Sequence, residues 1–345
     1  FEYPGGGGAY IVAKANLGEL PGLTAAAALM IDYVLTVSVS VAAGVAAVTS
    51  AVPALFPHRE VLGLLGILLL VIINLRGVRE SGRIFAAPTY VFIGAILLML
   101  GVGLLQILSG QSARVLPGQA GTPAPVVEGL TLFLLLRAFS SGCTALTGIE
   151  TISNGVLAFK RPEAKNAAIT MAVMAVILGT MFLGISALAY QYGVLPRADE
   201  TVVSQIARTV FGEGPLYYLV QASTMLILIL AANGAFAGFP RLASLLAKDS
   251  YMTHQMAVMG DRLVFSNGII FLGVFACSLI VLFHGETHAL IPLYAVGVFL
   301  SFTLSQAGMV RRWVTKRGPH WRKKLVVNGV GAVTTAVATV IIAST

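Results

Sequence analysis

Long apolar stretches alternate with short segments that hold the charged residues, and this pattern runs along the whole chain. Nine windows are each apolar over about 18 residues or more, the length that an α-helix needs to cross a bilayer core. None shows the alternation of a transmembrane β-strand. We therefore predict nine membrane-spanning helices, over 22–52, 59–76, 84–108, 128–157, 167–191, 215–239, 266–284, 288–310 and 325–343.

Composition supports a membrane protein. Of the 345 residues, 57% are hydrophobic and 10% are charged, whereas about 25% are charged in soluble domains. Because backbone groups in lipid must be satisfied within each segment, the fold class is an all-α integral membrane protein. The net charge of +8 does not indicate a nucleic-acid partner, since the basic residues are spread between the apolar stretches.

The distribution of Lys and Arg predicts the orientation. If all nine helices cross, 17 of the 22 basic residues fall on one side, and loops rich in Lys and Arg are cytoplasmic. Phe1 then starts in the cytoplasm, Thr345 ends outside, and the chain is a multi-pass protein of the cell membrane. Since the chain opens without Met inside a segment of loop composition, we expect it to be a fragment.

An acidic residue lies deep within the first predicted helix. Asp32 is about ten residues from its start, which corresponds to a depth of about 15 Å, and an ionisable group at that depth is a functional-site hypothesis by default. Thr36 and Ser40 follow at offsets of four on the same helical face, and Tyr33 is adjacent. These oxygens suit a hard cation. Alternatively, the two hydroxyls bond to carbonyls of their own helix.

The window 128–157 has an unusual composition for a membrane helix. Gly142, Gly148 and Gly155, together with many Ser and Thr residues, interrupt it, which predicts a broken helix whose free backbone groups face a site. Glu150 is a second acid at depth. The alternative is close helix packing through small residues, with Glu150 turned inward.

Other polar residues carry weaker signals. Tyr294 is either an aromatic residue at the membrane interface or a phenolic ligand, and Asn233 and Gln306 fit hydrogen bonds between helices. The His-x-Glu-x-His cluster at 284–288 lacks the helical geometry of a zinc protease. The glycines at 5–8 lack the remaining residues of a phosphate loop. We therefore expect no transition metal, no cofactor and no enzymatic activity.

Four segments together resemble a known family. The sequence YPGGGGAY at 3–10 resembles the loop after the second helix of amino acid–polyamine–organocation (APC) superfamily permeases. Residues 31–40, 73–82 and 144–150 are similar to the bacterial potassium importers of the KimA type within it. The resemblance covers essentially the whole chain.

The resemblance implies the five-plus-five inverted-repeat bundle of the leucine transporter (LeuT-like). Residues 1–21 would be a cytoplasmic loop, 22–109 the remainder of the first repeat, 128–310 the second repeat and 325–343 an additional helix. The family's first two helices would be missing. As it stands, such a polypeptide should not transport.

The resemblance also implies a potassium site. Its ligands would come from three helices: Asp32, Tyr33, Thr36 and Ser40, then Thr147 and Glu150, then Tyr294. Asp32 and Glu150 are both candidate proton carriers, and coupled acids titrate as a pair, so the choice between them stays open. The implied function is proton-coupled K⁺ uptake by alternating access, with K⁺ and H⁺ as partners and a homodimer as a candidate assembly.

Rival functions remain. A proton-coupled amino acid or polyamine permease shares the fold and differs in its substrate. A non-transporting scaffold or receptor subunit would make the buried acids dispensable. A passive channel would need a repeated selectivity-filter loop, which the sequence does not resemble.

Overall fold

The computed structural model describes residues 3, 8–77, 82–110, 131–143, 148, 152, 156, 159–197, 199–258, 265–318 and 320–344. These residues form helices and connecting loops, with no strand among them. Seven helices are long and apolar enough to cross a membrane. Their parent elements are α2 (Glu19–Ala51), α3 (Arg59–Leu75), α4 (Gly82–Leu108), α7 (Glu163–Tyr192), α9 (Pro215–Lys248), α11 (Thr287–Thr315) and α12 (Trp321–Ala343).

The remaining elements are short. They are α1 (Gly8–Leu17), α5 (Leu132–Cys143), α8 (Val202–Phe211), α10 (Ser266–Leu282), η1 (Pro53–His58) and η4 (His254–Met256). Seven of the nine predicted windows thus hold a long apolar helix. The windows 128–157 and 266–284 hold α5, of 12 residues, and α10, of 17 residues. The count of nine crossings and the inverted repeat stay predictions.

One predicted boundary is wrong. We expected the helix at 215–239 to end before Pro240, but α9 continues through this proline to Lys248. Its last turns bury Ala243 and Leu246, so packing outweighs the backbone hydrogen bond that a proline removes. The 1–21 segment, predicted as a loop, contains the helix α1.

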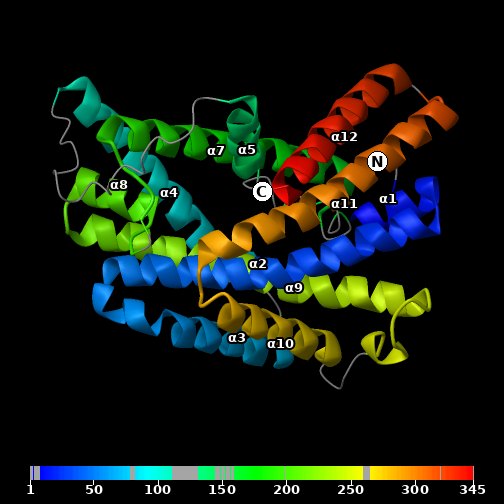
Figure 1. The fold of residues 1–345 in the computed structure, drawn as a ribbon, viewed down its shortest axis with the longest axis horizontal. Coiled ribbons are helices and arrows are strands. Elements are labelled where there is room, and N and C mark those ends of the chain that lie inside the picture. The colour runs from blue at the N-terminus through cyan, green and yellow to red at the C-terminus, as the bar shows by residue number, and fades with distance from the viewer. Residues whose placement is uncertain are drawn as a thin grey trace.

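Helix α2 lies at the centre of the bundle (Figure 1), in contact with α1, α3, α9, α10 and α11. The largest buried apolar cluster joins α2, α3, α9 and α10 through residues such as Val37, Ile67, Phe239 and Leu272. Between α3 and α9, Asn74 Nδ2 donates to Asn233 Oδ1 at 2.8 Å, which confirms the predicted interhelical bond of Asn233. The candidate acid therefore sits on the most enclosed helix.

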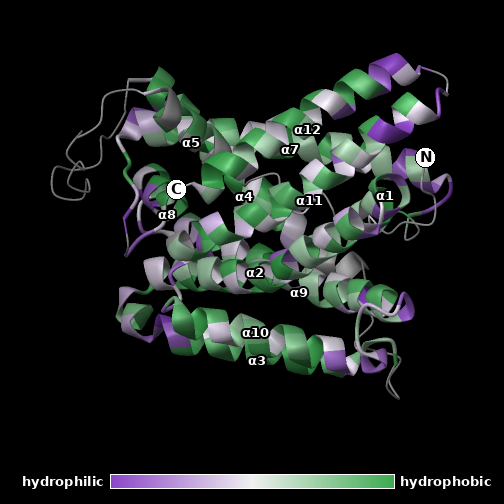
Figure 2. Cartoon of the chain, turned by 45° about the vertical axis from the view of Figure 1, so that its right-hand side comes forward, coloured by the Kyte–Doolittle hydropathy of each residue, from purple (hydrophilic) through white to green (hydrophobic). Residues whose placement is uncertain are grey.

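The outer helices show the opposite pattern. Large apolar side chains such as Leu69 on α3, Leu105 on α4, Val176 on α7 and Val330 on α12 are exposed. Hydrophilic residues gather at the two ends of the bundle and hydrophobic residues between them (Figure 2). Apolar outside and polar within is the arrangement that a lipid solvent favours.

The two ends of the bundle carry different short helices. Helix α1 caps one end and α8 lies at the other, and we call them the α1 end and the α8 end (Figure 1). Gly18 has a φ of 110°, a value that favours glycine, and it allows the chain to turn sharply from α1 into α2. A Cβ on Gly22 would lie 2.7 Å from Lys14 Cβ, so the two helices touch at this turn.

Candidate functional site

The side chain of Asp32 is completely buried. It lies 13 residues after the start of the 33-residue helix α2, or about 20 Å along a helix about 50 Å long. Its exposed fraction is 0%. The carboxyl group is therefore inside the bundle and near mid-depth, where the sequence predicted it.

Helix α11 packs closely against the backbone of α2 beside Asp32. A Cβ on Gly297 would lie 3.2 Å from the carbonyl oxygen of Ala28 and 3.7 Å from the amide nitrogen of Asp32. Tyr294 lies three residues earlier, on the same face of α11. Its exposed fraction is 8%, and it packs in a buried cluster with Leu35 of α2. Tyr294 thus packs against the helix that carries Asp32, and its role as a ligand stays a prediction.

Tyr33 faces a different neighbour. A Cβ on Gly238 of α9 would lie 2.6 to 2.8 Å from three atoms of the Tyr33 ring, including its hydroxyl oxygen. Only glycine leaves room for the ring there. The backbone of α2 at Asp32 thus packs against α11, and the ring of Tyr33 packs against α9.

The hydroxyl groups of Thr36 and Ser40 differ in their hydrogen bonding from those of other serines on α2. Ser38 Oγ donates to the carbonyl oxygen of Val34 at 3.1 Å, and Ser50 Oγ donates to that of Ala46 at 2.7 Å. Among the described residues, the Thr36 and Ser40 side chains make no hydrogen bond. The alternative that they bond to carbonyls of their own helix therefore does not hold in this part of the structure.

Two of the predicted ligands, Thr147 and Glu150, lie outside the described residues. Between them, Gly148 has a φ of 94°, which an α-helix does not contain. The backbone is therefore not α-helical at Gly148, and the broken helix of the window 128–157 stays a prediction.

A cavity of about 300 Å³ opens at the α8 end, on the same helix as Asp32. On α2 its lining begins at Ala42, two residues after Ser40, and reaches Ser50. The rest of the wall comes from the loop before α8 and from Arg59 and Glu286. The cavity thus extends from the surface of the bundle toward the candidate site.

Ion pairs surround this cavity. Arg59 bonds to Glu286 at 2.9 Å, which ties the start of α3 to the start of α11. Arg197 pairs with Asp199 at 3.0 Å, and its hydrogen bond is the largest cause holding the pKa of Asp199 below its usual value. Arg208 pairs with Glu200 at 3.3 Å and donates to the carbonyl oxygen of Ser50, at the end of α2. The elements around the cavity are therefore connected by charged groups.

At the α1 end, an ion pair and a hydrogen bond join α1 to the residue that follows α9. Lys14 Nζ lies 2.7 Å from Asp249 Oδ2, just after α9, and Tyr10 also donates to that carboxylate. On the other side of α1, a Cβ on Gly308 of α11 would lie 3.0 Å from the carbonyl oxygen of Val12. We call Tyr10, Lys14 and Asp249 the α1 clamp. The clamp joins α1 to the end of α9, and the contact of Val12 with Gly308 joins α1 to α11.

Comparison with known proteins identifies the family of the chain. Residues 2–344 match the family described as amino acid permease. The chain belongs to the amino acid permease family. It is therefore a multi-pass membrane transport protein by family and not an enzyme. It is 52% identical over 332 residues to a protein named potassium transporter KimA from Bacillus subtilis (strain 168), covering 96% of this chain and 54% of the relative. The permease chain spans about half the length of this curated relative.

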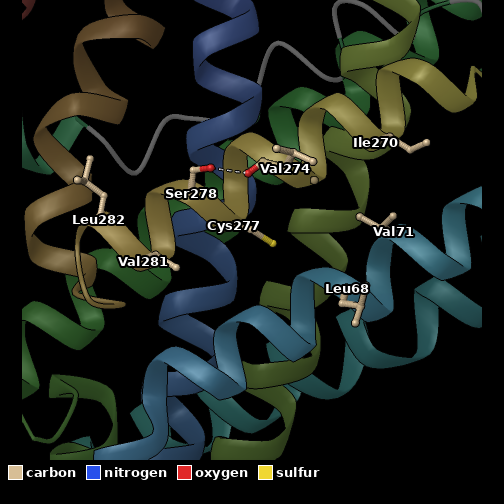
Figure 3. Close-up of a pocket in the computed structure, with 9 residues that line it drawn as sticks. Leu68, Val71, Ile270, Val274, Cys277, Ser278, Val281 and Leu282 are labelled. Carbon is tan, nitrogen blue, oxygen red and sulfur yellow. Dashed lines mark hydrogen bonds between the residues drawn. The ribbon is translucent and has the colours of Figure 1, made fainter.

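A second hollow is unrelated to the site of the permease. A groove of about 600 Å³ lies between α3 and α10 (Figure 3), lined by apolar side chains such as Leu68, Val71 and Val274. Cys277 is also in its wall. The hydroxyl of Ser278 donates to the carbonyl of Val274 at 2.9 Å. The groove is lined by no acidic or basic side chain and faces the apolar exterior.

The sequence did not reveal the ionic groups at the two ends. Glu286 was noted only as part of a cluster that fails as a zinc motif, yet it pairs with Arg59, and His284 Nδ1 lies 2.9 Å from Glu60. Lys14 and Asp249 are 235 residues apart in the sequence. No spacing within one segment could have indicated these pairs.

We expect Asp249→Asn to lower the melting temperature of the permease by about 1–4 °C, because it breaks a partly exposed ion pair. The hydrogen bond from Lys14 is the largest cause lowering the pKa of Asp249, and the bond to Asp249 is the largest cause raising the pKa of Lys14. The Asp249 contribution is lost only as the pH falls through its lowered pKa, and that of Lys14 only as the pH rises through its raised pKa.

The difference in melting temperature between Asp249→Asn and wild type should therefore stay constant from about pH 5 to pH 9. Thermal unfolding of the purified full-length protein in detergent at three pH values measures it. Glu163→Gln is the control, because its partner Arg161 is 93% exposed and that pair should contribute little. Equal melting temperatures for Asp249→Asn and wild type would contradict the clamp.

Proposed function

We propose that the protein takes up K⁺ and couples this uptake to protons by alternating access. The similarity to a protein named potassium transporter carries the choice of substrate. The complete burial of the Asp32 side chain is the observation that supports the choice of site. A cation offsets the cost of burying a carboxylate at this depth.

The ligands we propose are oxygens from three segments. The Asp32 carboxylate supplies the charge, and the Thr36 and Ser40 hydroxyls replace part of the water shell of the ion. Tyr294 adds a phenolic oxygen from the facing helix, and the ring of Tyr33 fixes α2 against α9 with its hydroxyl as a further ligand. In this proposal Thr147 and Glu150 complete the shell, and either Asp32 or Glu150 carries the proton.

Alternating access is supported by the contrast between the two ends. At the α8 end a cavity extends along α2, and at the α1 end the clamp joins α1 to the end of α9. We infer that ions enter through the cavity and leave past α1 when the clamp opens. The α1 end faces the cytoplasm in this proposal, because most Lys and Arg residues lie there.

The family description favours a second candidate, a proton-coupled amino acid permease. Its substrate would need donors for a carboxylate and acceptors for an ammonium group. The described face of α2 offers one acid and hydroxyls, which suits a bare cation better than a zwitterion.

The test is uptake by the full-length protein in a bacterial strain that lacks its own K⁺ importers. We expect growth at low external K⁺, saturable uptake of Rb⁺ as a K⁺ tracer, and loss of accumulation when a protonophore collapses the proton gradient. An excess of mixed amino acids should leave Rb⁺ uptake unchanged. Failure to rescue growth, together with accumulation of a labelled amino acid, would replace the K⁺ proposal with the second candidate.

A further inference from the structure

The excess positive charge of the chain is concentrated in one turn. Helix α11 ends at Thr315 and α12 begins at Trp321, and we call residues 311–324 the basic turn. From residue 287 to residue 345 the sequence has no Asp or Glu. The other 15 Lys and Arg residues nearly balance the 14 acids of the chain, so this turn supplies most of the net charge of +8. Its cations are Arg311, Arg312, Lys316, Arg317, Arg322, Lys323 and Lys324.

The described part of the protein does not pair five of these seven cations with an acid. Five of the cations are exposed, and none of the five has a carboxylate within 4.0 Å in the described part of the chain. By contrast, Lys14, Arg59, Arg197 and Arg208 are each paired. Hydrophilic residues are gathered at this tip of the α11–α12 hairpin (Figure 2). The turn therefore presents unpaired positive charge outward.

Both tryptophans of the chain lie in this turn and arrange its cations. The guanidinium carbons of Arg317 and Arg322 lie 5.2 and 5.5 Å from the ring centroid of Trp321. Lys324 Nζ lies 4.3 Å from that of Trp313. A guanidinium beside an indole keeps its N–H edges available for a bidentate contact with a phosphate. Two arginines on one ring thus form a prearranged pair.

The location of the turn identifies the partner. It joins two helices that are each long and apolar enough to cross a membrane, so it lies at the depth of the lipid headgroups. The hairpin is held together below the turn, where Thr303 Oγ1 donates to Thr335 Oγ1 at 2.9 Å. Tryptophan and clustered Lys and Arg residues at this depth suit anionic lipids.

We propose that the basic turn binds the phosphate headgroups of anionic phospholipids, with Arg317 and Arg322 on Trp321 as its central pair. The lipid neutralises the turn and holds the end of α11, the helix that carries Tyr294 and Gly297, in the membrane surface. The basic turn is separate from the proposed substrate site, and the proposal does not depend on which substrate the protein transports.

The experiment measures binding of phosphatidylglycerol and phosphatidylcholine to the purified full-length protein by native mass spectrometry. Wild type should retain phosphatidylglycerol preferentially. The pair Arg317→Gln and Arg322→Gln should weaken phosphatidylglycerol binding about 30-fold, taking the usual contribution of each cation near an anionic surface. The matched control pair, Arg161→Gln and Lys165→Gln, removes the same charge at the start of α7 and should leave binding within about twofold, since those residues lie outside the turn.

Trp321→Leu keeps every charge, so it preserves the orientation of the protein in the membrane while removing the shared ring. It should weaken phosphatidylglycerol binding several-fold, and Trp321→Phe should restore most of it. Equal losses in the turn pair and the control pair, or an unaffected Trp321→Leu variant, would overturn the proposal. Displacement of the lipid by millimolar inorganic phosphate would also overturn it, by showing that the turn binds soluble phosphate.

Discussion

Asp32→Asn is expected to reduce Rb⁺ uptake by the full-length protein about 100-fold or more. The substitution keeps the size of the side chain and one of its oxygens, but it removes the charge that pairs with the ion. Removing one member of a buried charge pair costs about 3–5 kcal/mol, which corresponds to a factor of about 10² to 4 × 10³ in affinity. Because Asp32 has an exposed fraction of 0%, water cannot screen the loss.

Two controls separate this loss from a general effect. Glu213→Gln removes a carboxylate at the α8 end whose side chain is 69% exposed, and its uptake should equal that of wild type. Asp32→Glu keeps the charge but displaces it by one methylene, so it should retain part of the activity. Expression and melting temperature are measured for each variant. Wild-type uptake by Asp32→Asn would remove Asp32 from the site and would favour a role in packing alone.

The Asp32→Asn variant also distinguishes the two roles left open for Asp32, K⁺ ligand and proton carrier. If the carboxylate is mainly a K⁺ ligand, Asp32→Asn raises the KM for Rb⁺ and leaves the dependence on the proton gradient intact. If it is mainly the proton carrier, Asn imitates its protonated form, and downhill Rb⁺ flux persists while accumulation against a gradient is lost. Glu150→Gln should give the complementary result.

Much of the bundle could be predicted because the bilayer imposes a simple rule on each segment. A membrane helix must be long and apolar, so six of the seven windows were placed within about five residues of the helices found, and the seventh misses only the end of α9. An acid at depth is costly, so Asp32 could be identified from its position alone. Its burial and that of Tyr294 agree with this reasoning.

What the sequence could not predict depends on contacts between distant segments. The end of α9 was missed because packing of Ala243 and Leu246 overrides the local signal of Pro240. The clamp of Lys14 and Asp249 and the pair of Arg59 and Glu286 join residues more than 200 positions apart. A single sequence contains no information on which exposed charges meet. Thr147 and Glu150 remain predictions, since they lie outside the described residues.

The second large effect is expected from Gly297→Val, which should reduce uptake about tenfold or more in a protein that still folds. A Cβ at this position would lie 3.2 Å from the carbonyl oxygen of Ala28, and the branched side chain of Val adds two further carbons. The obstructing atom belongs to the backbone, so no side-chain rotation can make room. Overpacking of this kind costs about 1–3 kcal/mol, and here it would separate α11 from α2 beside Asp32.

A graded series makes this prediction specific. Gly297→Ala should reduce uptake less than Gly297→Val, because the Ala28 carbonyl must yield by only a few tenths of an ångström. Gly101→Val on α4 is the matched control, since a Cβ there meets nothing within 4 Å and faces the apolar exterior. Its uptake should equal that of wild type. If Gly297→Val transports normally, the contact of α2 with α11 is not needed during the transport cycle. Tyr294 could then no longer be held as a ligand, because its place against α2 depends on that contact.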